Sequence, residues 1–124
     1  SFRLPRAAAM TDAPTPAELR ARLAGTPDTA GLPEALLERL AAEDPALRAQ
    51  AAAELTELYN LTWREGQAPV DEAGFAAALT LVQVGWQAGA LQWLRYTAPA
   101  LIGPAAVVLY ADDDGRGFRA CIEA

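Results

Sequence analysis

A run of about twenty residues without a charged side chain, from Gly74 to Leu94, constrains the fold more than any other part of the chain. Large apolar residues recur in it at helical spacing, which predicts one buried helix, either continuous or broken between Gly85 and Gly89. Asp71 lies just before the run and is a suitable N-cap for that helix. The apolar stripe consists of Phe75, Leu79, Val82, Trp86, Leu91, Trp93 and Leu94.

The same run approaches the length of a membrane-spanning helix, so that alternative has to be weighed. Thr80 and three glutamines would be costly in hydrocarbon, and three glycines weaken a continuous helix. No cluster of basic residues flanks either end of the run. We therefore expect the run to lie in a protein core, and we do not expect membrane association.

The composition of the 124-residue chain limits the classes of function that it can have. Sixteen acidic and ten basic residues give a net charge of −6, which argues against nucleic-acid binding. The chain has no histidine, the commonest general base and zinc ligand. We therefore predict a non-enzymatic protein without a cofactor or metal. The single cysteine, Cys121, excludes an internal disulfide and fits a reducing cytoplasm. The bias towards arginine, alanine and proline suggests a bacterial source.

Residues 1–10 show no clear structural pattern, whereas the residues from Thr15 onwards predict the start of a helix. Residues 1–10, SFRLPRAAAM, lack the apolar core of a secretion signal and are interpreted as a cloning remnant or an upstream extension. Residues 11–124 are then a single helical domain. The sequence Thr15-Pro16-Ala17-Glu18 predicts a helix start, with a threonine cap, proline at the first position and glutamate at the third. That helix carries Leu19 and Leu23 inward and ends at Gly25.

Two further helices are predicted next, joined by a very short turn. Pro33 opens the first helix, and Asp44-Pro45 ends it and caps the second. A turn this short makes the two helices antiparallel, as an αα-hairpin. The residues expected on their buried faces are Leu36, Leu37, Leu40, Leu47, Ala51, Leu55, Leu58 and Tyr59.

The segment of residues 33–60 resembles one HEAT repeat. The resemblance rests on Leu36-Leu37, Asp44-Pro45-x-Leu47-Arg48-x-x-Ala51-Ala52 and Leu55. In that family the Asp-Pro turn caps the second helix, and the arginine helps to tie neighbouring repeats. A solenoid needs roughly three or more such units, so we expect one HEAT-like hairpin within a small helical domain. The resemblance implies scaffolding or partner binding.

The C-terminal part favours strands. Residues 106–110, AVVLY, and residues 118–122, FRACI, predict a short β-hairpin around the turn at residues 112–115. The three aspartates of that turn lack the remaining ligands of a calcium loop, so a solvated turn is favoured over a cation site. The predicted fold is therefore mostly α: a HEAT-like αα-hairpin around a central apolar helix, with a short C-terminal β-hairpin.

The function predicted from these features is protein–protein interaction, as a scaffold or adaptor. The alternative is a binder of a small apolar ligand between helices, for which a cavity between Trp86 and the face formed by Ala51 to Ala53 would be evidence. Trp63 next to Arg64 has the composition of an interface anchor, or else Trp63 folds back over the core. The open edge of the C-terminal hairpin and the apolar run favour a homodimer or a complex with an unlike protein. The residues predicted to bind the partner are Trp63, Arg64, Trp93, Tyr96 and Val108.

Overall fold

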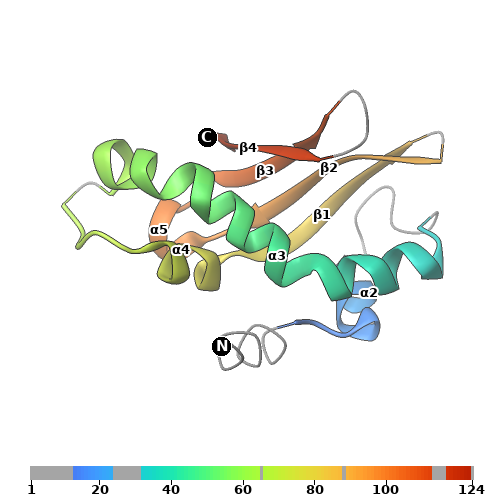
Figure 1. Cartoon of the computed structure of the whole chain (residues 1–124). Helices are drawn as coiled ribbons and strands as arrows, with labels where there is room; N and C mark the ends of the chain where they lie inside the picture. Colours follow the sequence, from blue (N-terminus) through green and yellow to red (C-terminus); the bar gives the residue numbers. More distant parts are fainter. Residues whose placement is uncertain (1–12, 24–31, 65, 88, 113–116, 124) are drawn as a thin grey trace, which may run out of the picture.

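The computed structural model describes residues 13–23, 32–64, 66–87, 89–112 and 117–123. They form a four-stranded antiparallel sheet in the order β1-β2-β3-β4, with the long helix α3 crossing one face (Figure 1). The helices are α2 (Pro16–Leu23), α3 (Glu34–Leu58), α4 (Glu72–Ala78) and α5 (Pro99–Ile102), and a π-helical turn, η2 (Tyr59–Trp63), continues α3. The strands are β1 (Thr80–Gln87), β2 (Ala90–Thr97), β3 (Ala106–Ala111) and β4 (Phe118–Glu123). The fold is therefore α+β, and the prediction of a mostly helical domain was wrong.

The uncharged run supplies most of α4, all of β1 and the first five residues of β2, where a central helix had been predicted. Bulges interrupt the pairing of β1 with β2 between Leu81 and Gln83 and between Gly85 and Trp86. A bulge adds one residue to a strand, so the buried side chains of Leu81 and Val84 come three apart, as they would on a helix. Among the described residues, no helix combines the length and apolar character that crossing a bilayer requires.

Two predicted helix caps are confirmed. At the start of α2, Glu18 N donates to Thr15 Oγ1 at 3.0 Å and Thr15 N donates to Glu18 Oε1 at 2.9 Å. This reciprocal pair satisfies two amides that a helix start leaves without partners. At the start of α4, Asp71 Oδ1 accepts from Gly74 N at 2.7 Å. The predicted end of the first helix at Gly25 lies outside the described residues.

Helix α3 runs without interruption through Asp44 and Pro45, so the predicted αα-hairpin is absent from residues 34–58. A proline inside a helix removes one backbone hydrogen bond and costs about 3 kcal/mol. Leu40 and Leu47, on either side of Pro45, are both buried against the core, and this packing offsets the cost. The relation of this segment to HEAT repeats stays a prediction.

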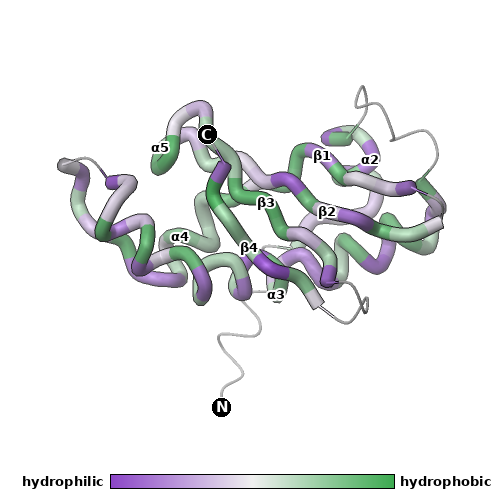
Figure 2. Tube along the Cα trace, turned by 90° about the horizontal axis from the view of Figure 1, so that it is seen from above, coloured by the Kyte–Doolittle hydropathy of each residue, from purple (hydrophilic) through white to green (hydrophobic). Residues whose placement is uncertain are grey.

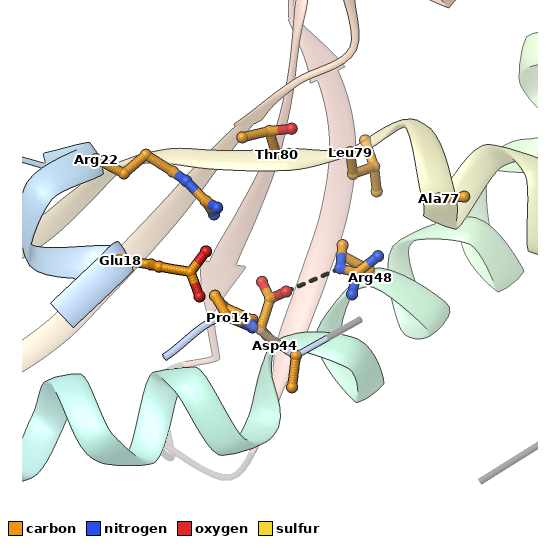
Figure 3. A pocket seen from close by; sticks show the side chains of 9 residues that line it. Pro14, Glu18, Arg22, Asp44, Arg48, Ala77, Leu79 and Thr80 are labelled. Atoms are coloured by element: carbon orange, nitrogen blue, oxygen red, sulfur yellow. Dashed lines mark hydrogen bonds and ion pairs between the residues drawn. The ribbon is translucent and has the colours of Figure 1, made fainter. Parts of the chain in front are cut away.

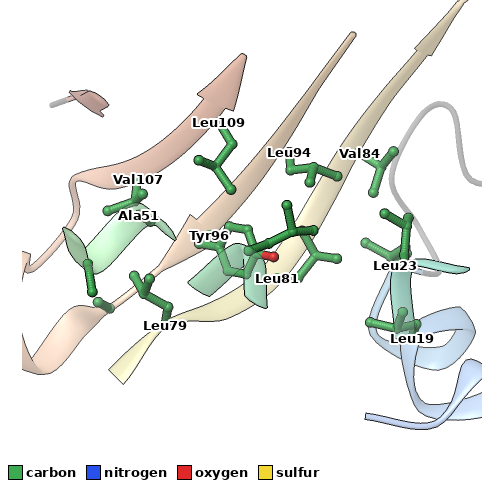
Figure 4. Packing of buried hydrophobic residues seen from close by; sticks show 14 of the residues in the cluster. Leu19, Leu23, Ala51, Leu79, Leu81, Val84, Leu94, Tyr96, Val107 and Leu109 are labelled. Carbon is green, nitrogen blue, oxygen red and sulfur yellow. The ribbon is translucent and has the colours of Figure 1, made fainter. Parts of the chain in front are cut away.

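The core lies between the helices and one face of the sheet, which we call the inner face (Figure 4). Paired residues of neighbouring strands share a face, and the pairs Leu94–Leu109 and Tyr96–Val107 are fully buried on the inner face. Helices α2 and α3 cover them with Leu19, Leu23, Leu37, Leu40, Ala51 and Leu55. Of the helix residues expected to be buried, only Leu58 is exposed.

The C-terminal hairpin forms as β3 and β4, but β3 also pairs with β2, so the hairpin belongs to the larger sheet. Side chains of α3 bind the outer edge of β4: Gln50 Nε2 donates to the Phe118 carbonyl at 2.6 Å, and Ala120 N donates to Glu54 Oε1 at 3.0 Å. The open hairpin edge that favoured a homodimer is therefore covered in its first half, at Phe118 and Ala120, within one chain. Most of the predicted turn, residues 113–115, lies outside the described residues.

Candidate functional site

The second face of the sheet, which we call the outer face, carries an aromatic and arginine-rich surface. Side chains alternate between faces along a strand, so Trp93 and Arg95 point away from the helices that cover Leu94 and Tyr96. In Figure 2, which looks onto the sheet from above, no described helix lies over β2, β3 and β4. The described helices therefore leave the outer face of β2, β3 and β4 uncovered (Figure 2).

The strand register orders this face into rows. One row crosses the sheet from Gly85 through Trp93 and Tyr110 to Arg119. The Trp93 ring lies against Gly85, because a Cβ atom at Gly85 would come within 2.3 Å of ring atoms. Tyr110 is 42 % exposed and Trp93 is half-buried. The row thus presents two aromatic rings, one of them fixed by close packing.

The neighbouring row consists of Gln83, Arg95, Val108 and Cys121. Val108 is only 2 % exposed, so it forms the floor of the outer face and not a contact point. Burial, followed by the nearby Glu123 carboxylate, raises the pKa of the Cys121 thiol. A raised pKa keeps the thiol protonated at neutral pH, which makes Cys121 a poor nucleophile.

Glu123 closes the far end of the face. Its Oε2 accepts hydrogen bonds from the Tyr110 hydroxyl and, at 3.6 Å, from Cys121 Sγ. The hydrogen bond to Glu123 is the main cause that raises the pKa of Tyr110. With Arg95 and Arg119 against Glu123, the described charges of the outer face sum to a positive value, although the whole chain carries −6.

The five residues predicted to bind a partner lie in three places. Trp93 and Val108 share the outer face, whereas Tyr96 is fully buried on the inner face. Trp63 ends η2 and packs against the core, as the second interpretation of this residue expected. Arg64 donates to the carbonyls of Asn60 at 2.9 Å and Gln67 at 2.6 Å and so holds the following loop.

Sequence reasoning missed Arg95, Tyr110 and Arg119 as members of the outer face. The alternation of residues 106–110 already placed Tyr110 on the same side as Val108. Arg95 was hidden because β2 had been interpreted as a helix, and the register that joins β2 to β3 cannot be read from either segment alone.

A second candidate is a charged cavity of about 310 Å³ between α2, α3 and the start of β1, which we call the charged pocket (Figure 3). Arg48 Nε donates to Asp44 Oδ2 at 2.8 Å, and the Tyr96 hydroxyl donates to Asp44 Oδ1 at 2.9 Å. Burial, and then the Asp44 charge, raise the pKa of Tyr96 far above its ordinary value. Glu18 and Arg22 of α2 line the same cavity.

A third candidate is a groove of about 690 Å³ between the first half of α3 and the ends of the two hairpins, which we call the Trp86 groove. Its apolar walls include Leu36, Leu47, Trp86, Leu91 and Phe118. An exposed ion pair of Arg39 and Glu43, 3.0 Å apart, lies at its border. The alternative prediction placed such a cavity between helices, with Ala51 to Ala53 opposite Trp86, whereas this groove lies between a helix and the sheet and those alanines do not line it.

Within the described part of the chain, no three histidine, cysteine, aspartate or glutamate side chains gather as a metal site requires. Comparisons with protein-family models, with curated proteins and with solved structures find no significant match to this chain. The arguments for function therefore rest on the three sites themselves.

Proposed function

We propose that this chain is a non-enzymatic protein–protein interaction domain that binds its partner with the outer face of the sheet. One observation carries the proposal: Trp93 and Tyr110 lie side by side on that face, next to Arg95 and Arg119. Tryptophan, tyrosine and arginine are enriched among the few residues that dominate the binding energy of protein interfaces. Because Gly85 already fixes the Trp93 ring, little side-chain freedom is lost there on binding.

The partner that fits best is an unlike cytoplasmic protein with an acidic surface. Both features that favoured a homodimer are weaker than the sequence suggested, since Leu81, Val84 and Leu94 of the uncharged run are buried within the chain and side chains of α3 bind part of the β4 edge. A second copy would present the same two arginines, whereas an acidic surface complements them. Multi-angle light scattering should accordingly find a monomer, and a stable dimer would favour the homodimer instead.

The test uses the full chain as bait in a lysate of its native host. A specific partner should be retained by the unmodified chain and lost with Tyr110→Ala and Arg119→Glu, two substitutions of exposed side chains. The matched control is Leu61→Ala, because Leu61 is 79 % exposed but lies on η2, outside the sheet. A partner that all three variants retain equally would show that the outer face is not the binding surface.

The Trp86 groove supports a second candidate function, binding of a small apolar ligand. Its volume of about 690 Å³ falls in the range of ligand pockets, and its walls combine large apolar side chains with the polar Arg39, Glu43 and Gln50. Trp86 lines the groove, so its fluorescence reports binding there once Trp63 and Trp93 are replaced by phenylalanine. In that variant, titration with dodecanol, a small apolar probe, should change the Trp86 fluorescence until the signal saturates. Leu47→Gln places a polar group in the wall and should weaken that binding. A response that does not saturate, or that Leu47→Gln leaves unchanged, rejects this function.

A further inference from the structure

The charged pocket gathers four charged side chains that arise from two helices. Glu18 and Arg22 lie one turn apart on α2, and Asp44 and Arg48 lie one turn apart on α3. Figure 3 shows the Glu18 and Arg22 side chains converging on the cavity above Asp44. Two carboxylates and two guanidinium groups therefore surround about 310 Å³ of space, with no net charge.

The Asp44–Arg48 ion pair is buried between α3 and the sheet. Its side chains are only 5 % and 9 % exposed. Two apolar side chains at these positions would also pack α3 against the sheet, so stability alone does not require the charges. Replacing a buried ion pair by apolar residues of similar volume is often neutral or stabilising. At the wall of a cavity, however, the pair presents charge in a low-dielectric setting, where its interaction with a bound molecule is stronger than in water.

The two α2 side chains retain capacity for further bonds. Glu18 Oε1 accepts from Thr15 N, and Oε2 takes part in none of the hydrogen bonds found for Glu18 among the described residues. Hydrogen bonds with Thr15, and then the charge of Arg22, lower the pKa of Glu18. Arg22 is not a member of the three ion pairs found within the described ranges. Asp44 uses one acceptor position on each oxygen, and a carboxylate offers about four.

We propose that the charged pocket binds a small zwitterion of the free α-amino acid class, with its carboxylate on Arg22 and its ammonium group between Glu18 and Asp44. An anion alone would meet two carboxylates, and a cation alone would meet two guanidinium groups. A molecule with both charges satisfies both sets at once. The site lies apart from the outer face of the sheet, so this inference does not depend on the proposed protein partner.

The chain offers variants that remove charge and keep the fold. Glutamine also serves at the third position of a capping box, so Glu18→Gln keeps the start of α2 and loses the charge. Arg22→Gln places another good helix former on the same face. The matched control is Arg20→Gln, because Arg20 lies on the same helix but pairs with the exposed Glu34 at 2.8 Å.

The experiment is isothermal titration calorimetry of the full chain with each of the twenty L-amino acids at up to 10 mM. At least one should bind saturably, and its N-acetyl amide, which lacks both charges, should not bind. Glu18→Gln and Arg22→Gln should each weaken binding at least tenfold, and Arg20→Gln should leave it unchanged. Circular dichroism checks that each variant is folded. The proposal is overturned if no amino acid binds saturably, or if Arg20→Gln weakens binding as much as Arg22→Gln.

Discussion

Asp44 shows how far the role of one residue can depend on distant parts of the chain. Its sequence position before Pro45 is typical of an N-cap, yet its carboxylate accepts from Arg48 within α3 and from Tyr96 on β2. The Tyr96 contact joins residues 52 apart in sequence. Local sequence correctly assigned Thr15 and Asp71 as caps because their partners lie three residues away.

The role of Asp44 can be measured. Asp44→Ala leaves Arg48 buried without its counter-charge, so the free energy of unfolding should fall by roughly 3–5 kcal/mol. Loss of a helix cap alone would cost about 0.5–2 kcal/mol. Glu43→Ala, which removes only an exposed ion pair, should cost less than about 1 kcal/mol. Urea denaturation distinguishes these values, and a loss for Asp44→Ala no larger than that of the control would contradict the buried-pair role.

At the scale of elements, helix starts and the C-terminal strands could be predicted, and the central hairpin could not. The bulge between Leu81 and Gln83 changed the period of two in β1 into an apparent helical spacing, and nothing local marks a bulge in that segment. Residues 106–110 and 118–122 alternate without a bulge and were identified as strands. Predicting the outer face needed the pairing of β2 with β3, so only Trp93 and Val108 of that face were found.

The continuity of helix α3 through Pro45 predicts that this proline destabilises the protein. In a continuous helix this proline leaves the Ala41 carbonyl without its usual backbone donor, and Pro45→Ala restores that donor. Alanine also gives the unfolded chain more conformational entropy, which opposes the gain. The net effect should be a stabilisation of about 1–2 kcal/mol. If Asp44-Pro45 instead began a new helix, the proline would be well placed and its replacement would not stabilise. The midpoint of thermal unfolding, followed by circular dichroism, decides between the two.

Gln50 and Glu54 of α3 hydrogen-bond to the outer edge of strand β4, and the effect of losing one of these bonds can be tested. Glu54→Ala removes the acceptor of Ala120 N, so hydrogen exchange of the Ala120 amide should become at least severalfold faster. An exposed edge is also a template for association, so the variant should aggregate at lower concentration. Glu57→Ala, an exposed glutamate one turn further on, is the control and should change neither property. Equal exchange in both variants would mean that Glu54 does not protect the edge.

At the scale of the whole molecule, the buried Tyr96 links stability to alkaline pH. The folded chain keeps Tyr96 protonated well above the pH at which a tyrosine of the unfolded chain ionises, about pH 10. Above that pH the unfolded state has lost a proton that the folded state retains. Stability conferred by neutral Tyr96 is therefore complete below about pH 10 and falls as the pH rises further.

The expected slope is up to about 1.4 kcal/mol per pH unit for this one group. Urea midpoints measured between pH 9 and pH 11.5 should fall steeply for the unmodified chain and less steeply for Tyr96→Phe. Tyr110→Phe is the control, because Tyr110 is on the surface and its ionisation is linked far less to folding. The interpretation is wrong if Tyr96→Phe and the unmodified chain lose stability in parallel above pH 10.

The order of elements along the chain has a consequence for synthesis on the ribosome. Helices α2 and α3 leave the ribosome first, and all four strands that cover the apolar face of α3 follow them. Until β1 to β4 have emerged, Leu37, Leu40 and Ala51 have no sheet to pack against, because domains generally fold as units during translation. The nascent chain therefore carries an uncovered apolar helix face until the strands have emerged, and this interval is when a chaperone would bind it.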